Sequence, residues 1–467
     1  MAAEFYRKEY TDLEDQLDQS GLALVSLGKL GRLFTGPFGS KLPASLYDTP
    51  GGVPLLRVAN IGNLFLDESD LARIPHEVHQ DIIRSRLETG DLALAKAGRL
   101  GALSRIPEHI AECNITQHIV GIRVHNKRVG CSYLAAFFLS RFGSFQLKRQ
   151  GIGTLIKYLG VEETRAARVA VPSPEVQAHI GAKIELAERC RQVAHKLHEE
   201  ATSRFDTELR TSDFCPSGAL SKVISPSTMT ERLNGEFYLP RYFSLQEHLE
   251  SLAVPTTSLR SLLRCDIIRS STPKRKDTAP IPCILTSDID PDEIRWRDPS
   301  LRITKPVHTS HKGRLQSNDV VYTSVGPPVG EAAVVLNQFL PMAAGGDVSI
   351  LRHGDQLHPG YLALYLNSVF GQMQNDRYAR GIRQRRVYPD DIGAFLIPAL
   401  EMNAQRFIGG RVVRSQVLNE VAIDLVGQAT ADVEALVEGG LDVDSIRSGN
   451  LRPPSAEDIP ELAEDTA

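Results

Sequence analysis

The sequence contains one pattern twice, and this internal repeat constrains the fold more than any other feature of the chain. Residues 3–17 (AEFYRKEYTDLEDQL) and 235–249 (GEFYLPRYFSLQEHL) share six identities at an offset of 232 positions. Further along, residues 90–102 match residues 318–332 at an offset of 228. Because order and spacing persist across both halves, we expect two copies of one domain arranged head to tail.

Each copy has the same internal plan, in which a mixed segment of short strands and helices precedes one long helix. Apolar residues recur every three or four positions over 176–197 and again over 412–436, which predicts one apolar stripe on each helix. The predicted fold class is α+β, a tandem pseudo-twofold repeat of mixed α/β domains separated by two long antiparallel helices. The predicted boundaries are 1–172 for the first mixed domain, 173–212 for the first helix, 213–398 for a linker and the second mixed domain, 399–440 for the second helix, and 441–467 for an acidic, disordered tail.

A long helix with one apolar stripe must bury that stripe against a partner. We expect the partner to be the helix of the other copy, because each helix is longer than a domain of this size requires. Packed antiparallel, the two helices would hold the mixed segments a fixed distance apart. The alternative is that each helix only covers its own domain.

Composition excludes several classes of protein. Hydrophobic residues make up 42% of the chain and charged residues 24%, which is ordinary for a soluble globular protein. There is no run of eighteen apolar residues, and the N-terminal residues are too polar for a secretory signal. The six cysteines are scattered without a C-x-x-C pair, which argues against structural zinc and fits reduced thiols. We therefore expect a cytoplasmic protein with no membrane segment.

The stretch TGPFGSKL (35–42) contains the residue types of a phosphate-binding loop in the wrong arrangement. Only two residues separate its glycines, whereas a P-loop needs four, and Ser40 precedes Lys41 instead of following it. Pro37 also removes a backbone N–H that such a loop would point at phosphate. The stretch is therefore a turn that faces DNA or an ordinary glycine–proline turn, and it does not bind nucleotide.

Catalytic motifs are missing from the sequence. It has no [DN]-P-P-[YFW] motif, no G-x-G-x-x-G after a strand and no P-loop, so it encodes neither an adenine methyltransferase nor a helicase motor. The carboxylates of DIDPDEIRW (288–296) lack the glycine and the distal glutamate of a calcium loop, and we interpret this segment as a solvated turn. His118 stands in an apolar, strand-like run, which favours a core histidine. We expect a non-catalytic chain without a cofactor or metal.

Four segments, met in order along the chain, carry a resemblance: GPFGS (36–40), GGVPLLRVANIGN (51–63), GDLALAKAG (90–98) and the strand-to-helix junction at 149–180. Together with the duplication, they resemble the specificity subunit of type I restriction–modification systems over residues 1–440. The resemblance implies that each mixed segment is a target-recognition domain that reads one half of a bipartite, asymmetric site in double-stranded DNA.

The resemblance also implies partners. The long helices would act as a ruler and as the docking surface for methyltransferase (modification) subunits, and a restriction/translocase subunit would join them. Those partners, and not this chain, would use S-adenosylmethionine, ATP and Mg. The second copy departs from the family pattern, with RSSTPKRK (269–276) in place of GPFGS. An alternative function is an interaction scaffold of a related defence complex that does not read bases.

Basic residues interleaved with Ser, Thr and Gln indicate where DNA would be contacted. The net charge of −4 does not oppose this, because a local basic face decides polyanion binding. Lys and Arg bind phosphate, whereas Arg with guanine and Gln with adenine give specificity. For each basic run, a solvated charged face is the alternative. In the first copy we expect contacts from Gly36, Phe38, Gly39, Ser40, Lys41, Lys96, Arg99, Lys148, Arg149, Gly151, Thr154 and Lys157. In the second copy we expect contacts from Arg269, Ser271, Thr272, Lys274, Arg275, Lys276, Arg380, Arg383, Gln384, Arg385 and Arg386.

Overall fold

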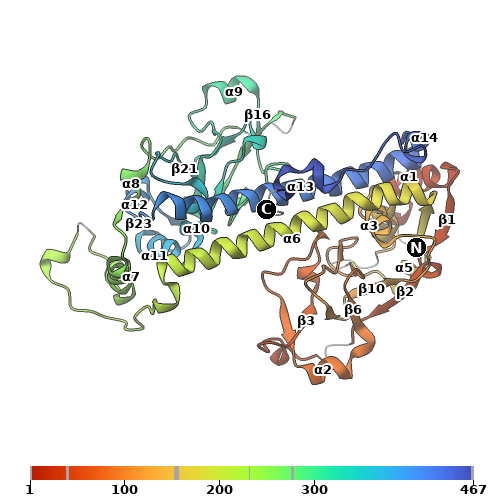
Figure 1. The fold of residues 1–467 in the computed structure, drawn as a ribbon, viewed down its shortest axis with the longest axis horizontal. Helices are drawn as coiled ribbons and strands as arrows, with labels where there is room; N and C mark the ends of the chain where they lie inside the picture. Colours follow the sequence, from red (N-terminus) through yellow and green to blue (C-terminus); the bar gives the residue numbers. More distant parts are fainter. Residues whose placement is uncertain (1–2, 38–41, 152–156, 231, 275–277, 464–467) are drawn as a thin grey trace. The chain divides into compact units, whose positions relative to one another are not determined.

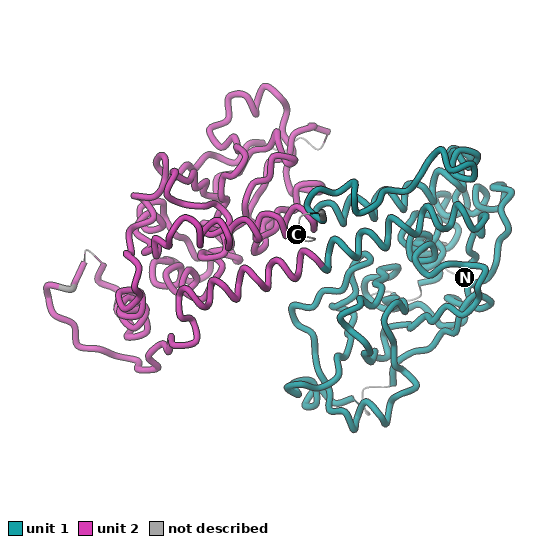
Figure 2. The backbone as a smooth tube through the Cα atoms, viewed as in Figure 1, with its two compact units in different colours: residues 1–192, 420–467 teal, residues 193–419 magenta. Residues whose placement is uncertain are grey.

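A computed structural model describes residues 3–37, 42–151, 157–230, 232–274 and 278–463 (Figure 1). The chain forms two compact units (Figure 2). Unit 1 contains residues 1–192 and 420–467, and unit 2 contains residues 193–419. Both boundaries fall inside the long helices, so each unit holds one mixed domain and a part of each helix.

Unit 1 is built on two mixed sheets with the strand orders β2-β10-β7-β8-β4 and β5-β3-β9-β6, and β1 pairs separately with β11. Leu, Ile and Ala side chains on the facing sides of these sheets form its core. Its elements are α1 (Lys8–Gln19), β1 (Ala23–Ser26), β2 (Gly31–Thr35), β3 (Val53–Leu56), β4 (Asn63–Leu64), β5 (Ala72–Ile74), α2 (His76–Asp81), β6 (Arg86–Glu88), β7 (Leu92–Ala95), β8 (Leu103–Arg105), β9 (Glu112–Ile115), β10 (Ile119–Val124), α3 (Cys131–Leu139), α4 (Arg141–Arg149), α5 (Val161–Ala166), β11 (Arg168–Val171) and the first half of α6 (Pro174–Leu209).

Unit 2 repeats this plan with shorter strands, in sheets ordered β19-β17-β21 and β16-β13-β20, and β12 pairs with β23 as β1 does with β11. Its elements are α7 (Pro240–Ser251), β12 (Thr256–Ser258), α8 (Leu259–Leu262), β13 (Ile281–Ile284), β14 (Ile289–Asp290), β15 (Glu293–Ile294), β16 (Arg302–Ile303), α9 (Lys305–Ser310), β17 (Val320–Thr323), β18 (Val325–Gly326), β19 (Ala332–Val334), β20 (Ala343–Ala344), β21 (Val348–Leu351), α10 (Pro359–Asn367), α11 (Val369–Tyr378), β22 (Arg385–Arg386), α12 (Pro389–Gly393), β23 (Leu396–Pro398) and the first half of α13 (Met402–Glu438).

The buried helices α3 and α10 show how local sequence produces this plan. Both consist almost wholly of apolar residues (CSYLAAFFL and PGYLALYLN), and a helix that is apolar on every side must lie in the interior. One tyrosine hydroxyl in each makes an equivalent hydrogen bond in the core. Tyr133 Oη donates to Ala170 O at 2.6 Å, and Tyr361 Oη donates to Pro398 O at 2.8 Å. The two tyrosines stand 228 positions apart, the offset of the sequence repeat.

An ion pair with a buried aspartate also recurs, 228 positions apart for the aspartate and 229 for the arginine. Asp91 accepts from the guanidinium of Arg123 on β10, with Nη2–Oδ2 at 2.6 Å. Asp319 accepts from Arg352, immediately after β21, with Nε–Oδ1 at 2.8 Å. Further contacts at this spacing are made by the side-chain amides of Gln146 and Gln374 and of Gln177 and Gln405. The predicted tandem repeat of mixed α/β domains is therefore confirmed down to single hydrogen bonds.

The two long helices are uninterrupted, with 36 residues in α6 and 37 in α13. Within unit 2, Ser415 Oγ donates to Ala194 O at 2.7 Å, and Arg411 Nε donates to Glu200 Oε2 at 2.7 Å. Because numbers rise along α6 as they fall along α13, the paired segments are antiparallel, as expected. Each helix also packs on its own domain, where Gln416 of α13 donates to Val334 O at 2.8 Å. Within unit 2, the helix segments therefore pack against each other and also against the mixed domain.

The C-terminal segment corrects one expectation. Residues 441–467 were expected to be disordered because acidic residues dominate them, yet the described part folds as α14 (Val443–Arg447) and α15 (Pro460–Ala463). Ile446 and Leu462 are buried, and Arg452 pairs with both carboxylate oxygens of Asp458 at 2.7 and 2.8 Å. A few apolar anchors spaced through the segment outweigh its acidic composition.

Candidate nucleic-acid interface

The arginine-rich stretch of unit 2 forms a short hairpin. Arg380 and Arg386 exchange two backbone hydrogen bonds of 2.8 Å, which closes a loop over residues 381–385. Gly381 has φ +98°, a conformation that side chains disfavour, so glycine suits this turn. Residues 385–386 form β22, which pairs antiparallel with β18 and ties the hairpin to the sheet region.

Three of the hairpin's predicted DNA-binding arginines are already engaged. Arg385 Nη1 lies 2.8 Å from Asp376 Oδ1, and Arg380 Nη2 lies 3.0 Å from Asp391 Oδ2. Arg386 Nη2 donates to Gln384 Oε1 at 3.0 Å. Arg383 is exposed and, among the described residues, has no such partner, and the neighbouring Ile382 is fully exposed at 101%. The hairpin therefore has braced sides and a free tip.

The second basic segment of unit 2, RSSTPKRK, lies along the neighbouring loop. Arg269 Nη2 donates to Gly346 O at 2.8 Å, and Thr272 Oγ1 accepts from Gly346 N at 3.0 Å. Ser271 and Lys274 are exposed, whereas Arg275 and Lys276 lie outside the described residues. The hydroxyl and guanidinium groups thus hold the segment to the loop before β21.

The structure brings these two basic segments together. Gly346 binds the RSSTPKRK segment through Arg269 and Thr272. The carbonyl oxygen of the next residue, Asp347, accepts a backbone hydrogen bond from Ser324 N at 2.9 Å. Ser324 O in turn accepts from Val387 N, directly after β22, at 2.9 Å. A continuous series of hydrogen bonds therefore links RSSTPKRK to the hairpin, and we call this region the unit 2 edge (residues 269–274, 345–347 and 380–387).

Unit 1 has an equivalent edge with different side chains. The bridge Ala97↔Tyr158 corresponds to the pairing Val325↔Arg386 in unit 2. Lys96 N donates to His118 O at 3.0 Å, and the His118 and Tyr158 rings lie 5.8 Å apart. We call residues 36–37, 96–99, 117–118 and 157–158 the unit 1 edge.

Sequence reasoning missed two polar residues of the unit 1 edge. His118 was expected in the core, but it is half-buried, and Gln117 Nε2 lies 3.1 Å from its Nε2. His118 corresponds to Asp347, because Lys96 N donates to His118 O as Ser324 N donates to Asp347 O, so an alignment of the two copies could have located it. Lys96, predicted as a contact, is half-buried, and this burial lowers its pKa. Arg99 and Lys157 are exposed.

The glycine of GPFGSK has a packing role. A Cβ built on Gly36 would lie 1.8 Å from Ile115 O, so only glycine lets this chain segment approach β9. A Cβ on Gly151 would likewise lie 2.4 Å from Leu100 Cδ1. The predicted contacts Phe38, Gly39, Ser40, Lys41 and Thr154 lie outside the described residues.

Solved structures resemble this chain over most of its length, whereas no protein-family model and no curated protein matches it. An S subunit of a type I restriction–modification system from M. genitalium is 11% identical, with 90% of this chain and 96% of that chain covered and a TM-score of 0.45. An HsdS subunit from Thermoanaerobacter tengcongensis is 17% identical, with 90% and 97% covered and a TM-score of 0.31. A type I R-M structure described in terms of complex assembly and conformational transition is 17% identical, with 90% and 98% covered and a TM-score of 0.29.

All three come from type I restriction–modification systems. Each TM-score lies below 0.5, so we base the functional proposal on the repeat and the edges of this chain itself.

One predicted contact in unit 1, Arg149, holds the fold together. Its Nε donates to Phe5 O at 2.7 Å and its guanidinium lies 3.9 Å over the Phe5 ring. The equivalent Arg377 of unit 2 donates to Phe237 O at 3.2 Å and lies 4.5 Å over that ring. This repeated contact explains why E-F-Y occurs at the start of both copies. Lys148, by contrast, is exposed.

The carboxylate-rich segment 288–296 is less solvated than expected. Asp288 is buried and accepts from Leu285 N at 2.8 Å and Ser300 N at 3.0 Å. Asp292 accepts from Asn367 Nδ2 at 3.1 Å, and burial raises its pKa to about 7. Asp288 holds the segment before β14 to Ser300, and Asp292 lies in the turn between β14 and β15, so the prediction of a solvated turn is wrong for both.

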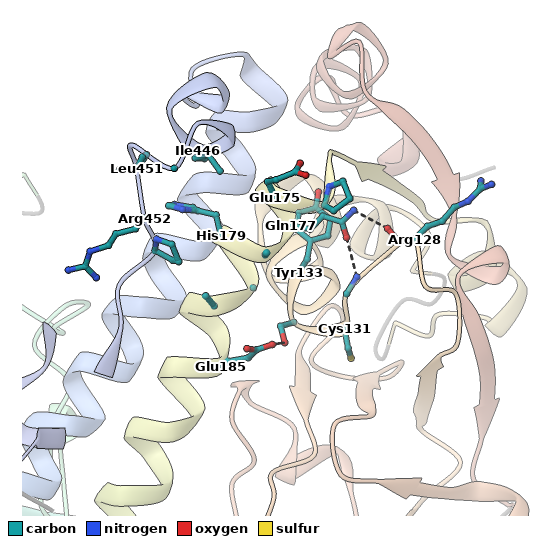
Figure 3. Close-up of a pocket in the computed structure, with 18 of the residues that line it drawn as sticks. Arg128, Cys131, Tyr133, Glu175, Gln177, His179, Glu185, Ile446, Leu451 and Arg452 are labelled. Atoms are coloured by element: carbon teal, nitrogen blue, oxygen red, sulfur yellow. Dashed lines mark hydrogen bonds between the residues drawn. The ribbon is translucent and has the colours of Figure 1, made fainter. Parts of the chain in front are cut away.

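Unit 1 contains a cavity of about 1010 Å³ between the start of α3, the first turns of α6 and the segment after α14 (Figure 3). Its polar groups are largely used within the fold. Gln177 accepts from Gly130 N at 3.1 Å and donates to Arg128 O at 2.9 Å, and Ser132 Oγ donates to Glu185 at 2.9 Å. The described part of the chain has no cluster of three His, Cys, Asp or Glu side chains suited to a metal ion. Its helices include none that is long and apolar enough to cross a membrane.

Proposed function

We propose that this chain is the non-catalytic DNA-recognition subunit of a type I-like restriction–modification complex. Each unit would read one half of a bipartite, asymmetric site in double-stranded DNA through its own edge. The long helices would set the distance between the half-sites and bind methyltransferase subunits, which a restriction/translocase subunit would join. S-adenosylmethionine, ATP and Mg would belong to those partners, and the complex would act in the cytoplasm.

One observation carries this proposal: the scaffolds of the two units are alike while their edges differ. The buried tyrosine contact recurs 228 positions apart, and the Asp–Arg pair recurs at 228 positions for the aspartate and 229 for the arginine. At the edges, Gln117 and His118 occupy the positions of Gly346 and Asp347, and Tyr158 occupies that of Arg386. A duplicated frame with unlike exposed side chains is what two readers of unlike sequences require.

The chemistry of the edges fits base recognition in a groove. The unit 2 edge supplies arginines for phosphate and guanine, and the unit 1 edge supplies an amide, an imidazole and an aromatic ring. At the corresponding turn of unit 2, Gly346 is half-buried and Asp347 is exposed, so the two edges differ in charge at this place. A solvated charged face would not need neutral aromatic and amide groups at the equivalent place.

Selection from a random DNA pool tests the proposal. The full-length chain, with its partner subunits if these are needed for solubility, should enrich two short unlike motifs at a constant spacing. Binding should weaken steeply as salt rises, because phosphate contacts release counterions. Recovery of the pool without any motif would overturn base recognition and favour an interaction scaffold that does not read bases.

The helices provide a second test, because α6 and α13 both cross the boundary between the units. Seven helical residues, about two turns, inserted after Gln192 and also before Glu420 would preserve the pairing of the helices. The insert adds about 10 Å of helix, so the gap between the selected motifs should grow by about three base pairs. An unchanged gap would contradict the ruler. The matched control is the same insert in the exposed loop at Gly218, which should leave the gap as it is.

A further inference from the structure

The hairpin of unit 2 separates into side chains that are held and side chains that are free. Asp376 and Asp391 hold Arg385 and Arg380, and Arg232 also pairs with Asp391 at 2.6 Å. The backbone bridge between Arg380 and Arg386 fixes the two arms relative to each other. Because both arms are held, the loop has little conformational freedom. Binding at the tip therefore costs little conformational entropy.

The two tip residues have unlike chemistry. Ile382 is fully exposed at 101%, within a stretch whose neighbours are glycine, arginine and glutamine. Arg383 is exposed and makes no ion pair with any residue that the structure describes. Ile382 exposes an apolar side chain to water at the end of the hairpin. Burial of this side chain against a partner would remove apolar surface from water, which is energetically favourable.

The major groove of DNA matches the shape of the hairpin and the chemistry of its two tip residues. It is wide enough for a two-stranded ribbon, and its floor presents the O6 and N7 acceptors of guanine and the methyl group of thymine. An arginine fork fits the guanine acceptors, and an aliphatic side chain packs on the thymine methyl. The paired arginines along the arms carry positive charge toward the phosphates on either side.

We propose that the hairpin tip is the base-reading element of unit 2, with Arg383 reading a guanine and Ile382 contacting the methyl group of a thymine beside it. Arg380, Arg385 and Arg386 are positioning residues that hold the hairpin and meet phosphates. This inference rests on the proposed function, since it names the bases that one half-site must contain. It also divides four arginines that look alike in the sequence into one base-reading residue and three positioning residues.

Site selection with tip variants tests the assignment. Arg383→Ala should make the guanine position unspecified and weaken the cognate site about ten-fold or more, while the other half-site stays unchanged. Arg383→Lys should keep affinity for non-cognate DNA but lose the preference for guanine, because a lysine cannot form the two-pronged contact. Arg406→Ala, which removes an exposed arginine of α13, is the matched control and should leave both half-sites intact.

Thymine is tested on the DNA side. Deoxyuridine lacks only the methyl group, so its substitution for the predicted thymine should weaken binding of the unmodified chain about four-fold. Ile382→Ala should bind thymine and deoxyuridine DNA equally, because the contact is already lost. Val307→Ala, at another exposed β-branched residue of unit 2, should keep the four-fold difference.

These experiments distinguish failure of the proposed function from failure of the tip assignment alone. If the unmodified chain enriches no bipartite motif, the proposed function fails and the tip assignment fails with it. If a bipartite motif is enriched but Arg383→Ala and Ile382→Ala change neither base preference, only the tip assignment is overturned. An equal deoxyuridine effect in the unmodified chain and in Ile382→Ala would also overturn the thymine contact.

Discussion

The two edges differ far more than the frames that present them. In unit 1, His118 and Tyr158 bring neutral rings to within 5.8 Å of each other. In unit 2, the matching positions hold two charged residues, Asp347 and Arg386. Beneath them, both units keep the same buried hydrogen bonds 228 positions apart. Exposed positions can therefore change with little cost in stability, whereas the buried polar contacts cannot.

The largest expected effect comes from breaking a frame contact in one unit only. Asp319 is 1% exposed and accepts from Arg352 and from Gln316 N at 2.8 Å. Asp319→Ala would leave the guanidinium without its partner and should lower the free energy of unfolding of unit 2 by about 3 kcal/mol. Trp296 is the one tryptophan of the sequence and belongs to unit 2, so denaturant unfolding followed by its fluorescence reports on that unit.

Asp91→Ala is the matched change in unit 1. The side chain of Asp91 is 10% exposed and that of its partner Arg123 is 32% exposed, so the cost should be smaller, about 2 kcal/mol. It should lower the unfolding midpoint seen by circular dichroism while leaving the Trp296 transition in place. If both variants moved the Trp296 transition equally, the two units would not be separable and the comparison would fail.

The next effect concerns a position where one copy needs glycine and the other does not. Phe34 pairs with Gly121, and Ile268 bridges the equivalent Ile350, so Gly36 corresponds to Ser270. Gly36→Ser would drive a side chain into Ile115 O and should destabilise unit 1 by about 2 kcal/mol. Ser270 Oγ donates to Ala344 O at 2.8 Å, so the reverse change Ser270→Gly removes one hydrogen bond and should cost less, about 1 kcal/mol. Thermal unfolding of both variants checks this, and equal destabilisation would contradict the assigned register.

The sequence was sufficient to predict the repeat, the two long helices and the basic hairpin, because each is a local or periodic pattern. The partners of Asp91 and Asp319 lie 32 and 33 positions away in the sequence, and no local sequence pattern indicates such a pair. Arg149 has the same difficulty, since its partner Phe5 is 144 positions distant. A basic residue looks alike in a sequence whether it braces the fold or faces a ligand.

The location of His118 was mispredicted for a different reason. Its neighbours Ile115, Ile119 and Val120 are buried strand residues, so the apolar pattern around it favours the core. The chain turns between β9 and β10, however, and this turn brings Gln117 and His118 to the unit 1 edge. Comparison with the other copy, where two glycines occupy the turn, is the signal that identifies it.

A moderate effect is expected from His118→Ala, which tests the unlike edges directly. Loss of the imidazole should weaken binding about ten-fold and relax base preference in one half-site only. The matched control is His109→Ala, which removes a histidine that pairs with Glu68 at 3.0 Å elsewhere in unit 1. Site selection with each variant measures the outcome. Relaxation of both half-sites by His118→Ala would contradict separate readers.

The smallest effect distinguishes the two units by pH. Asp292 and Leu64 stand 228 positions apart, and both adopt positive φ, +59° and +71°. Only unit 2 therefore has a titrating group at this turn. Burial raises the pKa of Asp292 to about 7, from about 4 in the unfolded chain. Between these values the folded state binds the extra proton, so unit 2 loses stability as pH rises from 4 to 7 and gains none above.

Asp292→Asn should remove this dependence, because the amide has the same shape without the charge and can still accept from Asn367. At pH 8 the variant should be more stable by about 1 kcal/mol, less than the full shift would give because the residue is only half-buried. At pH 4 the variant and the parent should be equal. Trp296 fluorescence during denaturation at both pH values measures the difference. A gain of the same size at both values would mean that the carboxylate acts through packing, and the proposed titration would be wrong.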